Sequence, residues 1–225
     1  MNAIAYIQSH FPTKFGIPRQ SGLLNELTSK IIFHPPYRNP DALRGMEEFS
    51  HLWIIWEFSE NKNKEWSPTV RPPKLGGNKR VGVFATRSPF RPNPIGLSCV
   101  KLEKIEYTAS SGPVIYIKGA DLMDGTPIYD IKPYLSYCDS HPDAVCGFAP
   151  EPSDTFRDVV IPDNLLNKLP EKLRSSLIEI LKNDPRPGYK TDTALSFGFE
   201  FAGYEISFMG ESGKITVTDI NKISD

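Results

Sequence analysis

The chain has 225 residues, 39% of them hydrophobic, with 26 basic residues against 27 acidic ones and a formal net charge of −1. This length and apolar content allow a full hydrophobic core, either in one large domain or in a main domain with an appendage. No apolar run approaches the roughly 18 residues of a membrane-spanning helix. Residues 1–9 also lack the basic start and long apolar stretch of a secretion signal. We therefore expect a soluble, cytoplasmic protein.

The cysteine and histidine residues do not form a metal-binding pattern. Cys99, Cys138 and Cys146 are an odd set without C-x-x-C spacing, and the four histidines are scattered along the chain. A zinc site needs ligands at short, regular spacings, and a disulfide framework needs paired cysteines. We therefore expect no metal, and we expect buried, structural thiols in a reducing compartment.

Short runs of strand-like composition, separated by proline and glycine, occupy the first two thirds of the chain. Residues 52–56 are apolar on both faces, which is typical of a central strand, whereas residues 100–105 mostly alternate as a half-exposed strand does. Residues 39–48 look helical, with Pro40 at a first helical position and Gly45 as a weak point. The pattern predicts a barrel or closed sheet with strands at 3–7, 30–33, 51–58, 80–84, 99–107, 114–118 and 128–134.

The pattern changes after a Pro/Glu-rich stretch near residue 150, which is the credible linker. Leucine and isoleucine then recur at helical spacing up to an Asp-Pro stop, which predicts one amphipathic helix. Strand-like residues 196–208 and 214–220 follow, joined by a Gly-Glu-Ser-Gly turn. We expect a mainly β protein, with an N-terminal β-barrel domain over residues 1–148 and a small α+β C-terminal domain over residues 155–225.

Positive charge is concentrated in one window. Residues 66–102 contain seven basic residues and no acidic one. The whole chain has 26 basic residues, so the rest of it has 19, against all 27 acidic ones. Positive charge is therefore concentrated in this window, and the rest of the chain is net negative. Trp66, Phe84 and Phe90 are interleaved with the arginines, and aromatic faces beside guanidinium groups suit unpaired bases as well as phosphates. The window predicts a polyanionic partner.

Within this window, residues 80–98 form a loop with three prolines after a short apolar run. Each proline fixes its own φ and restricts the residue before it, so the loop has little conformational freedom left to lose on binding. Such rigidity favours a preformed site that presents Arg87 and Arg91. The alternative is a proline-rich corner with solvated arginines, but the density of fixed angles and guanidinium donors argues against it.

Three further loops carry polar groups. Residues 121–130 hold three carboxylates, a glycine turn and a tyrosine, which alone is ordinary turn chemistry. If this loop lies at the same end of a barrel as the arginine loop, the arginines can hold an anionic substrate while one aspartate binds a cation or accepts a proton. Residues 15–22 and 183–190 are basic turns bounded by proline and glycine, and for the second a helix stop plus linker is an equal alternative.

Four motifs of the chain together resemble one family. They are R-V-G-V-F-A-T-R-S-P-F-R-P-N-P-I-G-L-S at 80–98, D-L-M-D-G-T-P-I-Y-D-I-K-P-Y at 121–134, P-R-Q at 18–20 and D-P-R-P-G-Y at 184–189. Through them the sequence is similar, over nearly its whole length, to the TsaA-like tRNA methyltransferases in their bacterial two-domain form. The resemblance implies a β-barrel enzyme. The chain indeed has neither the G-x-G-x-x-G turn nor the βαβ alternation of a Rossmann-type methyltransferase.

The resemblance also implies a reaction and partners. Members of the family transfer a methyl group from S-adenosylmethionine to N6 of N6-threonylcarbamoyladenosine, beside the anticodon of tRNA. The expected cofactor is therefore S-adenosylmethionine, and the expected partner is the anticodon loop of tRNA, with no membrane involved. The family further implies a homodimer, in which the C-terminal domain of one subunit helps to close the substrate site of the other.

Carried over residue by residue, the resemblance implies a set of contacts with the methyl donor. A methionyl carboxylate suits an arginine fork, and adenine suits an apolar slot with a few polar edge contacts. His51, at the entry of an apolar strand, could equally be a core histidine with a satisfied ring. The implied donor-binding residues are Pro18, Arg19, Gln20, His51, Leu52, Arg87, Leu97, Asp121, Asp124, Gly125, Thr126 and Pro127.

Methylation also requires a proton acceptor and anchors for the substrate. The reactive nitrogen belongs to a urea-like linkage and is a poor nucleophile, so its proton must leave during or after attack. A carboxylate is the expected base, and the candidates are Asp124 and Asp130, with Tyr129 as an orienting donor. Anticodon phosphates would supply most of the binding free energy. The candidates for substrate binding are Arg91, Arg186 and Tyr189. The two arginines suit the threonyl carboxylate.

Two other function classes are compatible with parts of the pattern. A non-catalytic RNA-binding or regulatory module would keep the basic window but need no donor pocket. A phosphoester hydrolase that uses the aspartates would require a metal, and the absence of paired histidine and aspartate ligand spacings counts against it.

Overall fold

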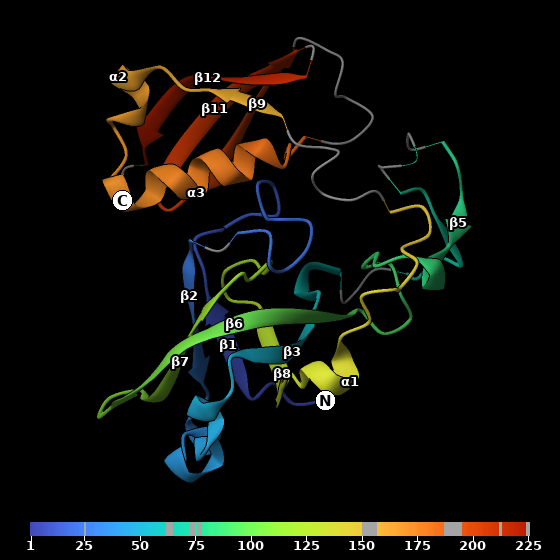
Figure 1. Ribbon diagram of the computed structural model, residues 1–225, viewed down its shortest axis with the longest axis vertical. Helices are drawn as coiled ribbons and strands as arrows, with labels where there is room; N and C mark the ends of the chain where they lie inside the picture. The colour runs from blue at the N-terminus through green and yellow to red at the C-terminus, as the bar shows by residue number, and fades with distance from the viewer. Residues whose placement is uncertain are drawn as a thin grey trace.

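The computed structural model describes residues 1–24, 26–61, 65–72, 75, 78–149, 157–186, 195–211 and 213–223. Within these ranges the chain forms a closed six-stranded barrel and a separate four-stranded sheet with helices (Figure 1). The expectation of a mainly β protein with an N-terminal barrel and a small α+β C-terminal unit is confirmed.

The barrel is antiparallel throughout and runs in the order β1-β2-β7-β6-β3-β8. It closes where β1 pairs with β8, through Ala5 opposite Ile128 and Tyr6 opposite Pro127. Alternate residues of each strand point inward and form one apolar core, which includes Ile7 and Ile117. The strands are β1 (Ala5–Gln8), β2 (Thr28–Phe33), β3 (His51–Glu57), β6 (Ile95–Thr108), β7 (Gly112–Lys118) and β8 (Pro127–Pro133).

The structure differs from two local predictions for the barrel. Strand β3 is central, between β6 and β8, but only its alternate residues such as Leu52 and Ile54 are fully buried, because a barrel wall has one inner face. The helix predicted over residues 39–48 is wrong. The chain there forms two short 3-10 turns, Pro40–Leu43 and Met46–Glu48, because Gly45 between them adopts a left-handed φ of 85°. A further 3-10 turn, Pro35–Tyr37, precedes them.

A small arm stands between β3 and β6. Strands β4 (Thr69–Val70) and β5 (Val81–Gly82) pair with each other, and a 3-10 turn at Val83–Ala85 follows at once. The strand predicted over residues 80–84 is therefore much shorter than expected. Another 3-10 turn, Ser59–Asn61, follows β3, and the short helix α1 (Ser136–Asp139) follows β8.

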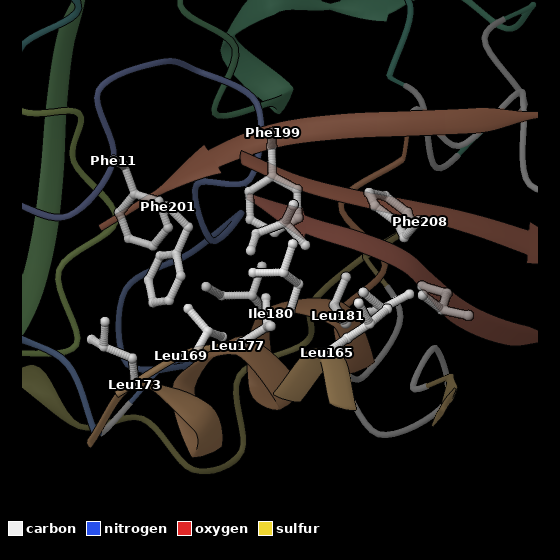
Figure 2. Packing of buried hydrophobic residues seen from close by; sticks show 14 of the residues in the cluster. Phe11, Leu165, Leu169, Leu173, Leu177, Ile180, Leu181, Phe199, Phe201 and Phe208 are labelled. Carbon is white, nitrogen blue, oxygen red and sulfur yellow. The ribbon is translucent and has the colours of Figure 1, made fainter. Parts of the chain in front are cut away.

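The C-terminal sheet has the order β10-β11-β12-β9 and is covered by α3 (Figures 1 and 2). The helix predicted from apolar spacing is confirmed as α3. The single strand predicted over residues 196–208 is instead two strands, which reverse at Ala202 and Gly203, both in left-handed conformations. The elements are β9 (Asp158–Val160), α2 (Asp163–Leu166), α3 (Glu171–Lys182), β10 (Ser196–Phe201), β11 (Tyr204–Glu211) and β12 (Lys214–Lys222).

The segment between β1 and β2 packs into the C-terminal core. Phe11, Leu24 and Leu27 lie in the same buried cluster as the aromatic residues of β10, and the ring centroids of Phe11 and Phe201 are 5.9 Å apart (Figure 2). The two cores are thus linked by residues 11–27. The domain boundary predicted between residues 148 and 155 stays a prediction, since residues 150–156 lie outside the described part of the chain.

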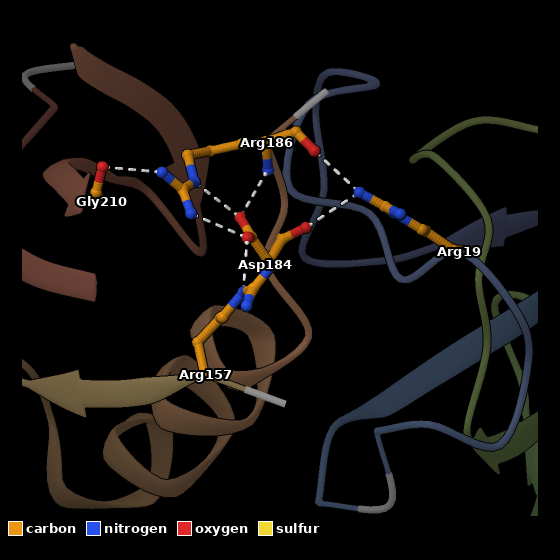
Figure 3. Close-up of polar contacts among 5 residues, drawn as sticks. All are labelled: Arg19, Arg157, Asp184, Arg186 and Gly210. Atoms are coloured by element: carbon orange, nitrogen blue, oxygen red, sulfur yellow. Dashed lines mark hydrogen bonds and ion pairs between the residues drawn. The ribbon is translucent and has the colours of Figure 1, made fainter. Parts of the chain in front are cut away.

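A buried ionic network stabilises the end of α3 (Figure 3). Arg186 has no exposed surface; its Nε and Nη2 donate to the carboxylate of Asp184 at 2.8 Å, and its Nη1 donates to the carbonyl of Gly210 at 2.8 Å. Arg157 Nε donates to the same carboxylate at 3.1 Å. Burial alone would raise the pKa of Asp184, but the hydrogen bonds and charge of Arg186, helped by Arg157, hold it below its ordinary value.

We expect Asp184→Asn to reduce the free energy of unfolding by about 3–5 kcal/mol, because it removes the negative charge that accepts two hydrogen bonds from the buried Arg186. Urea denaturation at neutral pH measures this loss. The difference from wild type should shrink in acid, since a carboxylate whose pKa is lowered by folding loses its contribution as the pH falls through the folded-state pKa.

The matched control is Asp219→Asn, which breaks the exposed 3.1 Å ion pair with Lys168 in the same unit. We expect a much smaller loss there, because solvent screens exposed pairs. Equal losses for the two variants would contradict the role assigned to the buried network.

Candidate functional site

A pocket of about 480 Å³ lies at one end of the barrel. Four separate segments line it, and each follows or precedes a barrel strand. They are residues 17–20 between β1 and β2, residues 56–61 at the end of β3, residues 86–97 before and within β6, and residues 121–126 before β8, with Lys14 beside them. The arginine loop and the aspartate loop therefore meet at the same end of the barrel, as the sequence argument required.

The loop at residues 18–20 is held from two sides. Arg87 Nη1 donates to the side-chain oxygen of Gln20, which connects this loop to the proline-rich one. On the other side, Arg19 Nη2 donates to the backbone carbonyls of Asp184 at 3.0 Å and Arg186 at 2.7 Å (Figure 3). The C-terminal unit thus positions a loop that lines the pocket.

Asp121 is a half-buried carboxylate in the pocket wall. Ser98 Oγ donates to its Oδ1 at 2.5 Å, and Trp56 Nε1 donates to Ser98 Oγ at 2.9 Å. Gly96 permits this arrangement, because a Cβ there would overlap the Trp56 indole. Burial raises the pKa of Asp121 above its ordinary value, although the Ser98 hydrogen bond and the charge of Arg87 oppose the shift. The site therefore holds a carboxylate that accepts a proton more readily than an exposed one.

A second carboxylate, Glu57, lines the pocket at the end of β3 and is buried. The Tyr129 hydroxyl is hydrogen-bonded to it, and burial together with this interaction raises the pKa of Tyr129 to about 12. Sequence reasoning missed Glu57 and its neighbours Phe58 and Ser59, which also line the pocket. The available signal was an acidic residue at the end of an otherwise apolar strand.

Backbone acceptors fix the proline-rich loop. Arg91 Nη1 donates to the carbonyls of Val83 at 3.2 Å and Thr86 at 2.6 Å, and Thr86 Oγ1 also donates to the Val83 carbonyl, at 2.8 Å. The Arg91 guanidinium carbon lies 5.6 Å from the centre of the Phe84 ring. Arg91 therefore braces the loop as well as lining the pocket.

The structure brings part of the predicted site together. Eight of the predicted residues line the pocket: Pro18, Arg19, Gln20, Arg87, Arg91, Leu97, Asp121 and Thr126. The other described ones are not in its lining: His51, Leu52, Asp124, Gly125, Pro127, Tyr129, Asp130 and Arg186. Tyr189 lies outside the described residues.

The reasons for these placements are structural. His51 begins β3 while Glu57 ends it, and an extended strand separates them by about 20 Å. Leu52 points into the barrel core. Asp124 Oδ1 accepts from the backbone N–H of Ser9 at 2.8 Å, so it braces the β1 end.

Two more predicted residues have other partners. Asp130 forms an exposed 3.0 Å ion pair with Lys132 on β8. Arg186 is enclosed with Asp184 in the network of the C-terminal unit, and its carbonyl accepts a hydrogen bond from Arg19, which lines the pocket.

The expectation for the cysteines is corrected. Cys138 and Cys146 are exposed, because they lie in the open stretch around and after α1, and Cys99 is half-buried on β6. Across the described ranges, no group of three or more His, Cys, Asp or Glu side chains is placed to hold a metal ion. None of the helices in the described part of the chain has the length and apolar character that a membrane crossing requires.

Comparison with known proteins decides the family. The model of the tRNA-methyltransferase O N-terminal domain matches residues 6–140, and that of the TrmO C-terminal domain matches residues 162–223. The chain belongs to the tRNA-methyltransferase O family. A tRNA (adenine(37)-N6)-methyltransferase of Escherichia coli K12 is 44% identical over 193 residues, which is 83% of this chain and 82% of that protein.

Two further members of the family support this assignment. A putative S-adenosylmethionine-dependent methyltransferase, RcsF, of Pseudomonas aeruginosa is 38% identical over 84% of this chain and 83% of that protein. A crystal structure of TrmO from Pseudomonas aeruginosa superimposes with a TM-score of 0.76 at 31% identity, covering 97% of both chains. The likeness to TrmO thus includes both the barrel and the C-terminal sheet.

We expect Asp121→Asn to stabilise the protein, because it removes the cost of burying an ionised carboxylate while its amide oxygen still accepts from Ser98. A carboxyl whose pKa is raised by folding destabilises the folded state above that pKa, and the penalty disappears as the pH falls. The gain in free energy of unfolding should therefore be larger at pH 8 than at pH 5. Urea denaturation at both pH values measures it, and a loss of stability at pH 8 would contradict the assignment.

Proposed function

We propose that this chain transfers a methyl group from S-adenosylmethionine to N6 of adenosine 37, the nucleoside beside the anticodon of tRNA. The observation that carries the proposal is the pocket, where an arginine, a buried carboxylate and a half-buried carboxylate from three separate segments meet at one end of the barrel. Relatives in the family are named tRNA (adenine(37)-N6)-methyltransferases, and others are named S-adenosylmethionine-dependent.

The residues that line the pocket fit this donor. Trp56, Phe58 and Leu97 offer apolar surface for an adenine ring, and Arg87 offers guanidinium donors for the methionyl carboxylate. Asp121 supplies negative charge for a sulfonium cation. When bound, S-adenosylmethionine supplies an electrophilic methyl group. The protein's part is to hold the acceptor nitrogen in line with that group and to exclude water.

The same pocket contains the groups that could take the N6 proton. Asp121 and Glu57 line it, whereas Asp124 and Asp130 do not, so we propose the first two as candidates for the base in place of the second two. The raised pKa of Asp121 brings it closer to the range in which a carboxylate is an effective base. Comparing the pH–rate profiles of Asp121→Asn and Glu57→Gln identifies which of them accepts the proton.

We further propose N6-threonylcarbamoyladenosine as the substrate and a cytoplasmic homodimer as the working form. The pocket lining contains four basic residues (Lys14, Arg19, Arg87 and Arg91) against three acidic ones (Glu57, Glu60 and Asp121). This positive balance favours a second anion beside the donor carboxylate, such as the threonyl carboxylate. A dimer is what the family resemblance implies, and sedimentation velocity at micromolar concentration tests it.

Arg87→Ala should weaken the binding of S-adenosylmethionine about tenfold to a hundredfold, since a charge-assisted hydrogen bond contributes about 1.5–3 kcal/mol. Isothermal titration calorimetry without added metal measures the change. Arg80→Ala is the matched control, because Arg80 belongs to the same basic window but donates to Thr69 on the arm and does not line the pocket. Unchanged donor affinity in folded Arg87→Ala would show that Arg87 faces RNA or solvent.

The wild-type protein should methylate tRNA that carries the threonylcarbamoyl group and leave unmodified transcript almost untouched. A site that pairs its arginines with the threonyl carboxylate loses charge-assisted hydrogen bonds when that carboxylate is absent, each contributing about 1.5–3 kcal/mol, which is enough for strong discrimination. Mass spectrometry of tRNA nucleosides, after reaction in vitro and from cells with and without the gene, detects the added methyl group. Equal methylation of both tRNAs would remove the threonyl-carboxylate argument and leave the methyltransferase proposal standing.

A further inference from the structure

The arm before β6 displays an aromatic ring where a buried one would be expected. Phe84 is 72% exposed, while its neighbour Val83 on the same 3-10 turn is 1% exposed. Val83 anchors the turn, because its N–H donates to the carbonyl of Pro68 at 3.0 Å. The turn therefore holds the Phe84 ring in water, at the cost of its hydrophobic burial.

The Phe84 ring is also held in place, and a cation lies next to it. The Thr86 N–H donates to the Val83 carbonyl at 3.1 Å, and Arg91 Nη1 donates to the carbonyls on both sides of Phe84, those of Val83 and Thr86. The Arg91 guanidinium carbon lies 5.6 Å from the ring centre, so a cation backs the phenyl group. Arg91 and Thr86 line the pocket, so Phe84 lies beside it, in contact with Arg91 of the lining although not itself part of that lining.

The sequence around Phe84 carries one sign of charge. Arg71, Lys79, Arg80 and Arg87 are exposed side chains of residues 66–102, the window without an acidic residue. Trp66, 50% exposed, adds a second aromatic surface at the start of the arm. Fixed aromatic rings among cations match single-stranded nucleic acid, whose bases stack on the rings and whose phosphates meet the cations.

We propose that Phe84 is a stacking platform for an unpaired base of the RNA, next to the adenosine that enters the pocket. This inference rests on the proposed function. An adenosine that enters the pocket must leave its stack, and its neighbour then loses a stacking partner. A rigid ring beside the pocket replaces that partner at little entropic cost. The exposed cations of the arm bind the adjoining phosphates.

The test compares binding of a synthetic anticodon stem–loop RNA by fluorescence anisotropy. Phe84→Ala should weaken binding roughly tenfold or more, and Phe84→Trp should restore it, because stacking needs a flat aromatic face rather than one side chain. Tyr107→Ala is the matched control, since Tyr107 is 54% exposed on β6 but lies twelve residues beyond the strand end at the pocket. We expect the control to bind RNA as the wild type does.

Salt dependence separates stacking from charge. Phe84→Ala should lower the affinity without changing the slope of log K against log salt, whereas Arg80→Ala should reduce the magnitude of that slope by about one if it contacts a phosphate. The alternative occupant of an exposed aromatic ring is a second copy of the chain. Loss of dimer in Phe84→Ala by sedimentation velocity would therefore overturn the proposal.

The two proposals fail in distinguishable ways. We expect Phe84→Ala to bind S-adenosylmethionine with the affinity of the wild type in calorimetry. Equal affinity would show that the pocket of the variant is folded. If the wild type methylates tRNA but Phe84→Ala binds the stem–loop as tightly as the wild type does, the stacking inference is overturned and the function stands. If the wild type binds RNA but transfers no methyl group to it, the proposed function fails, and the Phe84 comparison still reports on stacking.

Discussion

One constraint governs the site: the segment between β1 and β2 packs into the C-terminal core, although the strands that flank it belong to the barrel. Phe11, Leu24 and Leu27 bury their side chains in the C-terminal core, while the strands on either side of the segment close the barrel. Gly16 lies against the ring of Phe199, with no room for a Cβ. The loop that carries Arg19 to the pocket is thus fixed at both ends, and Arg19 itself is hydrogen-bonded to the C-terminal backbone. The C-terminal unit is therefore part of the pocket's support.

The wall of the pocket contains two acidic side chains that are partly or fully shielded from water. Asp121 keeps a raised pKa inside a hydrogen-bonded chain that begins at Trp56, and Glu57 is buried beside the Tyr129 hydroxyl. Burial of ionised groups opposes stability, and such costs are found where a site is preorganised for charge. In the C-terminal unit, by contrast, the buried Arg186 is paired with the carboxylate of Asp184, which also accepts a hydrogen bond from Arg157. One buried charge system thus stabilises the fold, and the other prepares the site.

The sequence was most informative where structure is determined locally. Alternation and proline spacing predicted the barrel and the rigid loop at residues 80–98, and apolar spacing predicted α3. Tertiary contacts decided what remained. Nothing local distinguishes the buried Arg186 from a solvated arginine between prolines, and the turn at Ala202 has no proline and only one glycine to signal it. Glu57 was missed because an acidic side chain at a strand end resembles solvated surface until neighbouring segments enclose it.

Closure of the barrel between β1 and β8 also bears on how the chain folds during synthesis. The pairing of Ala5 with Ile128 joins residues far apart in the sequence, and contacts of this kind form slowly because a long loop must first be closed. Phe11 and Leu24 reach their final packing later still, because the residues of β10, β11 and β12 that they pack with are synthesised after the barrel. One edge of the first strand and the apolar segment behind it thus lack their final partners for most of translation, although β2 can pair with the other edge early. Unpaired strand edges and exposed apolar surface of this kind favour aggregation of a nascent chain at its N-terminal end.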